Sequence, residues 1–193
     1  KESKHLQFCI CAGSSKEEVL QNFRTIKTEG YASVLKKAVS VIEEYKVAAG
    51  VNEAEIRIEE LMLSYLHFNS NYRLKKMSYR EKNNKSQMEL WKYGISGDYP
   101  IILLKIDDVD DVVKSTTFIR AFKLLRQKKV DCELVIIFME GGQYDRPIYN
   151  AVNDVVKLCK AEYLIEKRKG IHLVNIQNEE DINLLYAFSS YIN

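Results

Sequence analysis

Continuous apolar runs distinguish the second half of the chain from the first. Residues 101–106 (IILLKI), 133–139 (ELVIIFM) and 171–176 (IHLVNI) are apolar at most positions. Each is followed by a segment with helical spacing, the last of them over residues 179–192. Such runs are typical of strands buried on both faces of a parallel sheet. The sequence therefore predicts an α/β fold, with a small three-layer α/β unit and a short parallel sheet over residues 90–193.

Residues 14–89 show helical periodicity and predict an N-terminal helical segment that links to the α/β unit. Ser15 with Glu18, and Asn52 with Glu55, have the spacing of capping boxes, so a helix should begin at each. Residues 69–89 are polar and basic, which favours a solvated loop or an exposed helix. The alternative is an anion-binding role for the basic side chains of this stretch: Lys75, Lys76, Arg80, Lys82 and Lys85.

Residues 1–13 are interpreted as the terminal strand of a truncated β-sandwich. Residues 5–12 (HLQFCICA) alternate and then become continuously apolar, as a strand does. The chain begins at Lys1 without Met, so we expect an internal piece of a longer protein. A strand without its sheet should be disordered or should pair with a second copy, which predicts a dimer through this strand.

Charge and composition limit the kinds of partner that this chain is expected to bind. Lys and Arg number 29 and Asp and Glu 27, so the chain lacks the strong positive field on which nucleic-acid binding depends. No apolar stretch has the length of a membrane span, so we expect no direct membrane contact and a cytoplasmic location, with membrane association of the parent left open. Cys9 and Cys11 should share one face of the first strand, and we interpret all four cysteines as buried thiols of a reducing compartment rather than a metal site.

The segment GISGD, residues 94–98, is the most conspicuous local motif. It matches neither a P-loop, nor a dinucleotide fingerprint, nor a nucleophile elbow. It also precedes the first strand of the sheet, whereas ligands of parallel α/β folds bind beyond the carboxyl ends. We therefore expect a glycine-dependent turn that packs Trp91 and Tyr93 against neighbours, with Asp98 capping or bonding backbone.

Residues at the carboxyl ends of the strands are the other candidates for a ligand site. Asp107 opens an acidic run that could hold a hard cation or simply favour a helix N-terminus. Tyr144, Asp145 and Arg146 follow the second run and could contact sugar hydroxyls, or Asp145 and Arg146 could form a local ion pair. His172 lies within a buried strand, where a satisfied core histidine is the commoner case. No catalytic constellation emerges, and we expect neither a cofactor nor a metal.

The stretch LWKYGISGDYPIILLKI, residues 90–106, resembles a segment of the cyclic β-1,2-glucan synthases and of the related 1,2-β-oligoglucan phosphorylases, in the glycoside phosphorylase superfamily. The matching positions are Leu90, Trp91, Tyr93, Gly94, Ile95, Ser96, Gly97, Asp98, Pro100 and Ile101. Further matches are Val130, Asp131, Leu134, Val135, Ile136, Tyr144, Pro147 and Ile148. The start, FCICAGSSKEEVL, is similar to the end of the family's β-sandwich. Tyr99 and the segment FMEGGQ, residues 138–143, depart from the family pattern.

The resemblance implies a non-catalytic internal module of a large carbohydrate-active enzyme that makes or phosphorolyses β-1,2-glucan. In that family the chemistry lies in separate domains, including an (α/α)6 barrel, so no catalytic residue is carried over. The implied partners are the other domains of the parent and β-glucan. The alternatives are a stand-alone glucan-binding module and a small α/β transferase or hydrolase centred on Asp107 and Asp145. The donor sugar, the glucan length and the choice between synthase and phosphorylase stay open.

Overall fold

The computed structural model describes residues 8–68, 72–141 and 145–192. It divides into two compact units, Lys1–Glu44 and Tyr45–Asn193. Among the helices that fall in these residues, none combines the length and the apolar character that crossing a membrane requires.

The first unit contains helix α1, Lys16–Glu29, and most of α2, Tyr31–Ala49. Half of the capping box predicted for α1 is confirmed, because the Ser15 hydroxyl accepts a hydrogen bond from the backbone N–H of Glu18 at 3.2 Å. The Glu18 carboxylate reaches back to the N–H and hydroxyl of Ser14 rather than to Ser15, which corrects the other half. No residue of α1 is buried. Large apolar side chains are exposed on both helices, including Leu20, Phe23 and Leu35. The described part of this unit thus presents apolar side chains without enclosing a core of its own.

The predicted first strand is absent from the described part of residues 5–12. Residues 8–13 form no regular structure, and Phe8 and Ile10 are exposed; residues 5–7 lie outside the described part. Cys9 is exposed and Cys11 half-buried, with their Sγ atoms 3.6 Å apart, so the prediction that these thiols are buried is wrong. A strand needs a neighbour for its backbone hydrogen bonds, and none of the described residues forms a strand beside residues 8–13. Pairing with a second copy stays a prediction, as does the sandwich origin of residues 1–13.

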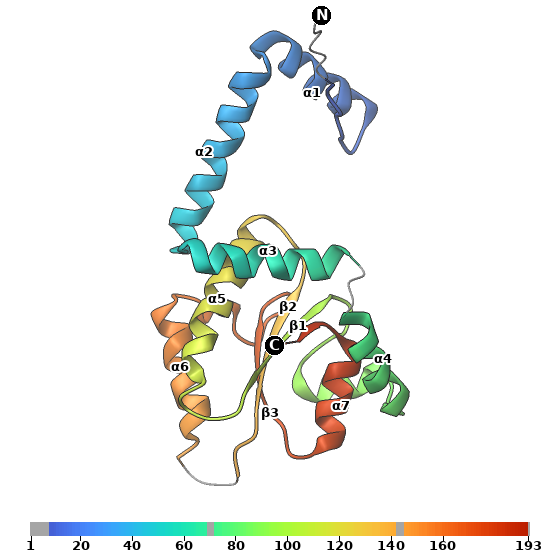
Figure 1. Cartoon of the computed structure of the whole chain (residues 1–193), viewed down its shortest axis with the longest axis vertical. Helices are drawn as coiled ribbons and strands as arrows, with labels where there is room; N and C mark the ends of the chain where they lie inside the picture. The colour runs from blue at the N-terminus through green and yellow to red at the C-terminus, as the bar shows by residue number, and fades with distance from the viewer. Residues whose placement is uncertain (1–7, 69–71, 142–144, 193) are drawn as a thin grey trace, which may run out of the picture. The chain divides into compact units, whose positions relative to one another are not determined.

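The second unit is built on a four-stranded parallel sheet in the order β3-β2-β1-β4, which confirms the predicted α/β class (Figure 1). The three predicted strands are β1, Ile101–Ile106, β2, Glu133–Phe138, and β3, Ile171–Asn175. The fourth is a correction. The last helix, α7, spans Glu179–Phe188 rather than continuing to residue 192, and Ser189–Ile192 forms β4 along the free edge of β1.

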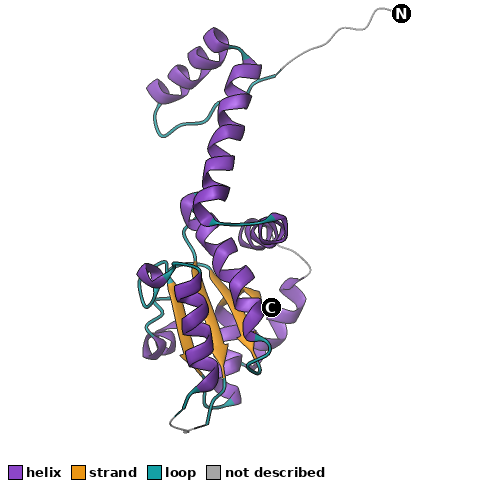
Figure 2. Ribbon diagram, turned by 90° about the vertical axis from the view of Figure 1, so that its left-hand side faces the viewer, coloured by secondary structure: helices purple, strands orange, loops and turns teal. Residues whose placement is uncertain are grey.

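Helices cover both faces of the sheet, as the continuous apolar strands require (Figures 1 and 2). Ile102, Leu104 and Ile106 of β1 share a core with α5, Val112–Gln127, and α6, Pro147–Leu158. The alternate β1 residues Ile101 and Leu103 pack with α7 and with a 3-10 helix, η1, Gln87–Tyr93. Right-handed crossovers explain this division, because the connection from β3 to β4 runs back across the sheet and so places α7 on the opposite face.

Further helices surround these layers. Helix α3, Glu53–His67, packs on α5 through buried carboxylates: Glu55 pairs with Arg120 at 3.0 Å and Glu59 with Lys128 at 2.8 Å. The predicted capping box at the start of α3 is confirmed. Helix α4, Tyr72–Lys82, lies against α7, and the short 3-10 helix η2, Glu162–Leu164, precedes β3.

The basic stretch before η1 is partly attached to α7. Arg80 donates to the carbonyl of Ala187 at 3.3 Å, and Lys85 pairs with Glu180 at 3.0 Å. These contacts give two of the basic side chains structural partners and weaken the anion-binding alternative. The side chains of Lys75 and Lys76 lie outside the described residues.

At the turn into β3, Gly170 has no room for a side chain. A Cβ at this position would lie 2.1 Å from the carbonyl oxygen of Leu164 and 2.6 Å from that of Lys167. Backbone atoms cannot move aside cheaply, so Gly170→Ala should lower the free energy of unfolding by about 1–3 kcal/mol in denaturant titrations. Gly141→Ala is the control, because no atom of the described residues lies within 4 Å of its Cβ position. Equal stability of the two variants would contradict the prediction.

Candidate functional site

The carboxyl edge of the sheet, where parallel α/β folds usually bind ligands, is occupied by side chains of this chain. Glu140 follows β2 and is buried. Its carboxylate accepts hydrogen bonds from the backbone N–H groups of Ile148 and Tyr149, the latter at 3.2 Å. Asn175 holds Glu140 in place by bonding both its N–H and its carbonyl. The N-terminus of α6, a position that commonly holds an anionic ligand, is therefore already capped by a carboxylate.

The residues predicted at this edge do not assemble into a site. Asp107 pairs with Lys105 at 2.5 Å, and Asp108 accepts from the N–H of Asp111, so these acids make local contacts. Asp145 and Arg146 are exposed, and no contact between described residues joins either of them to Asp107. Tyr144 lies outside the described residues. Across the described parts of the chain, no group of three His, Cys, Asp or Glu side chains has metal-binding geometry.

The amino edge of the sheet carries the GISGD segment, and its first two residues form the cap of η1. Gly94 has φ 72° and ψ 10°, the left-handed conformation that glycine adopts most easily. Its N–H bonds the carbonyl of Trp91 at 2.9 Å, and the N–H of Ile95 bonds that of Leu90 at 3.3 Å. Leu90 and Ile95 are fully buried in the core beneath α7. This arrangement is a Schellman-type cap with its usual apolar contact, and it confirms the predicted glycine-dependent turn.

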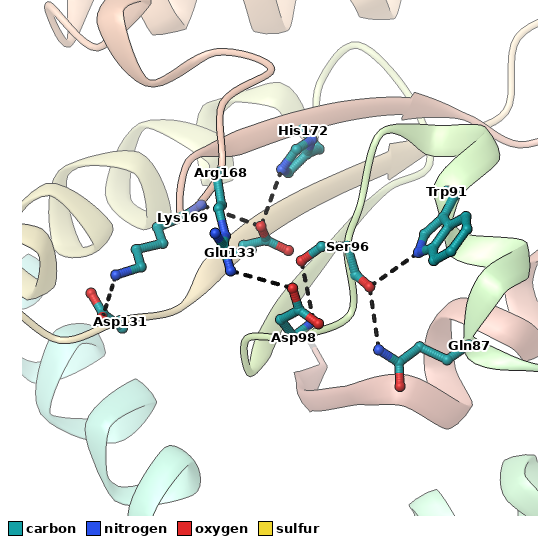
Figure 3. A network of polar contacts seen from close by, with 9 residues as sticks. All are labelled: Gln87, Trp91, Ser96, Asp98, Asp131, Glu133, Arg168, Lys169 and His172. Carbon is teal, nitrogen blue, oxygen red and sulfur yellow. Dashed lines mark hydrogen bonds and ion pairs between the residues drawn. The ribbon is translucent and has the colours of Figure 1, made fainter.

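The two aromatic residues before the cap, Tyr93 and Trp91, differ in their exposure to solvent. Tyr93 is half-buried and packs on the core beneath α7, as predicted. Trp91 is 63% exposed, so the prediction that it packs against a neighbour is wrong. Its indole N–H donates to the carbonyl of Ser96 at 3.4 Å, and the Gln87 amide donates to the same oxygen at 3.3 Å (Figure 3). The indole is thus held by its polar edge while its ring stays accessible to solvent.

An open groove lies beside this tryptophan. It has a volume of about 390 Å³ and is lined by Gln87, Trp91, Gly94, Ser96 and Asp98. The amino-edge loop, residues 94–99, contributes Gly94, Ser96 and Asp98 to this lining and turns at a second left-handed glycine, Gly97, with φ 74°. The Ser96 hydroxyl accepts from the N–H of Asp98 at 3.1 Å and tightens the turn.

An ion pair and cation–π contacts connect the amino-edge loop to the turn of residues 166–170. Asp98 pairs with Arg168 at 3.4 Å rather than bonding backbone, which corrects the prediction for its side chain. The Tyr99 ring contacts both cations of this turn, with Arg168 5.0 Å and Lys169 4.9 Å from the ring centroid. These contacts join loops that precede β1 and β3, so residues far apart in sequence support one groove.

Behind the groove, His172 lies between two carboxylates. Its side chain is 2% exposed, and its ring nitrogens lie 3.4 Å from Glu166 and 3.8 Å from Glu133. These distances are those of ion pairs rather than of hydrogen bonds. Burial lowers the pKa of His172, but the two carboxylates outweigh burial and raise it to about 9. The histidine is therefore buried as predicted, but as an imidazolium held by charge.

The other charged residues at the amino edge of the sheet form a network of ion pairs and hydrogen bonds rather than a reactive centre (Figure 3). Glu133 accepts from the backbone N–H of Lys169 at 3.2 Å. The Lys169 ammonium pairs with Asp131 at 2.6 Å, and together with Arg126 it lowers the pKa of Asp131. Sequence reasoning missed Glu133, Glu166 and Arg168. The one available signal was an acidic residue, Glu133, at the start of a strand that is otherwise apolar.

No protein-family model matches the chain. The chain is 30% identical over 70 residues to the cyclic beta-(1,2)-glucan synthase NdvB of Rhizobium meliloti (strain 1021). The matching segment covers 36% of this chain but only 2% of the length of that relative. This is a distant and partial relationship.

The pKa of His172 predicts a specific dependence of stability on pH. Because the folded value of about 9 lies above the ordinary 6.5, the native state binds the proton more tightly than the unfolded state. The resulting stabilisation should be full below about pH 6.5 and should disappear as the pH rises to about 9.

Denaturant titrations across this range check that dependence. The difference in unfolding free energy between the wild type and His172→Gln should shrink as the pH rises, by an amount on the order of 3 kcal/mol. The exposed His67→Gln variant is the control and should track the wild type. A constant difference at every pH would contradict a charged His172.

At the carboxyl edge of the sheet, the buried Glu140 should stabilise the start of α6. Glu140→Ala removes the acceptor for two N–H groups of α6 and should cost about 1–3 kcal/mol of unfolding free energy. Glu162→Ala, on an exposed side chain, should cost less than about 0.5 kcal/mol. Differential scanning calorimetry compares the two, and equal midpoints would show that the buried cap contributes nothing.

Proposed function

We propose that this chain is a non-catalytic module of a larger carbohydrate-active protein that makes or phosphorolyses β-1,2-glucan. The observation that carries the proposal is the similarity to a cyclic β-1,2-glucan synthase over 70 residues. The chain corresponds to a very small share of that relative, so the activity of the relative need not reside in the matching segment.

The chemistry of the described residues supports a role other than catalysis. A transferase or hydrolase needs a positioned acid, base or nucleophile that can reach a substrate. Here Asp107 is paired with Lys105, Glu140 caps a helix, and His172 is buried between two carboxylates. Asp145, the other acid of the alternative enzyme hypothesis, is exposed and joined to none of these.

The surface of the first unit supports contact with another folded domain. Exposed apolar side chains on α1 and α2 include Leu20, Phe23, Leu35, Val39 and Ile42. Apolar surface of this kind on a soluble unit usually marks an interface. We infer that neighbouring domains of the parent cover these helices, so that the module positions its sugar-handling neighbours.

An activity assay on the chain tests the non-catalytic part of the proposal. The chain is incubated with β-1,2-glucooligosaccharides, with and without inorganic phosphate, and released glucose and glucose 1-phosphate are measured. We expect product at the level of a no-protein blank. Turnover that scales with protein concentration and persists in a repurified sample would overturn the proposal.

Deletion in the native organism tests the link to glucan. Removing the coding segment of this chain in frame should lower cellular β-1,2-glucan to the background of a full gene deletion. A strain that carries Glu162→Ala in the same gene is the control and should keep normal glucan. Unchanged glucan in the deletion strain would refute the proposal.

A further inference from the structure

We propose that the groove beside Trp91 is a binding site for one pyranose ring of a neutral glucan chain, with the indole as its stacking platform. The groove is lined by Gln87, Trp91, Gly94, Ser96 and Asp98. The inference deepens the proposed function and rests on it for the choice of β-1,2-glucan as the ligand.

Exposure of Trp91 is the first observation that requires an explanation. A tryptophan side chain is large and mostly apolar, so folding alone favours its burial. The chain has a single tryptophan, and 63% of it is exposed, whereas Leu90 and Ile95 beside it are fully buried. The Schellman-type cap directs position 91 away from the core, so packing within this unit does not account for an indole there.

The platform is also preorganised. The carbonyl of Ser96 accepts from both the indole N–H and the Gln87 amide, at 3.4 and 3.3 Å (Figure 3). A Cβ at Gly97 would lie 2.6 Å from the Gln87 side chain, so this glycine lets the loop and Gln87 come together. A ring held in one orientation before binding loses little conformational entropy when a ligand stacks on it.

Polar groups at the rim match the hydroxyl edge of a sugar. The Asp98 side chain is 56% exposed and pairs with Arg168 at a long 3.4 Å, so both groups are open to a ligand. A carboxylate accepts from sugar hydroxyls and a guanidinium donates to them. A pyranose presents C–H groups on its faces and hydroxyls around its edge, which is the complement of an indole face bordered by polar side chains.

The volume of the groove and the charge of the residues around it favour a neutral sugar as the ligand. A volume of about 390 Å³ falls within the roughly 300–1,000 Å³ of small-molecule sites, which suits a single ring of a longer chain. The charge of Asp98 is balanced by Arg168, and Lys92 is neutralised by Asp181 at 2.6 Å. Among the described residues, these pairs leave no excess charge that would favour a phosphate or a basic peptide over a neutral sugar.

Intrinsic fluorescence tests the proposal directly because Trp91 is the one tryptophan of the chain. Titration of the full chain with short β-1,2-glucooligosaccharides should shift its emission and saturate in the millimolar range or below. β-1,3- and β-1,4-glucooligosaccharides are the comparison and should bind more weakly. No saturable change with any glucan, or tighter binding of another linkage, would overturn the assignment.

Calorimetry on variants locates the binding. Trp91→Ala should weaken binding at least about tenfold, whereas Trp91→Phe keeps an aromatic face and should stay within a few-fold of the wild type. Asp98→Ala should also weaken binding. Tyr163→Ala removes another exposed ring, 57% accessible, and should bind like the wild type. Unchanged affinity of a folded Trp91→Ala, verified by circular dichroism, would refute the groove.

The two proposals fail separately. Loss of cellular glucan in the deletion strain without binding at Trp91 would leave the proposed function standing and remove the groove. Saturable binding at Trp91 with unchanged cellular glucan would support the groove and refute the role in glucan metabolism.

Discussion

Burial of β1 and β2 on both faces is the constraint on which the rest of the second unit depends. Every residue of β2 is buried, and β1 has a single partly exposed residue, Lys105. Two helical layers must therefore cover the sheet, and polar chemistry is confined to its two edges. At the carboxyl edge, Glu140 caps α6. At the amino edge, Glu133 of β2 and Glu166 of the preceding turn form ion pairs with His172, and an open groove lies beside Trp91.

The sequence predicted the sheet well because its signal is local. Continuous apolar runs identified the first three strands, and the caps at Ser15 and Asn52 follow from short-range spacing. Strand β4 escaped prediction because it is only four residues long and its two apolar residues, Tyr191 and Ile192, fall at helical spacing from Phe188. Only the unpaired edge of β1, a feature of the folded chain, makes an extended conformation favourable at Ser189–Ile192.

The amino-edge site was harder to predict, for a different reason. Glu133, Glu166 and His172 come from a strand, a turn and another strand, so their proximity appears only when parallel strands align. The motif of residues 94–98 was recognised, and its glycines were correctly assigned to a turn. The direction in which that turn sends Trp91 depends on which residues its cap buries, and the spacing of the motif alone does not determine it.

The neighbouring thiols of Cys9, which is exposed, and Cys11, which is half-buried, have a consequence for handling the protein. Thiols 3.6 Å apart in an irregular, accessible segment are open to oxidants, and burial does not protect them as it does Cys132 and Cys159. In air they can close a disulfide within one chain or link two chains. A dimer that dissociates on addition of a reductant would be a sulfur cross-link, whereas a reductant-resistant dimer would be held by noncovalent contacts, either backbone pairing of residues 8–13 or the exposed apolar side chains of α1 and α2.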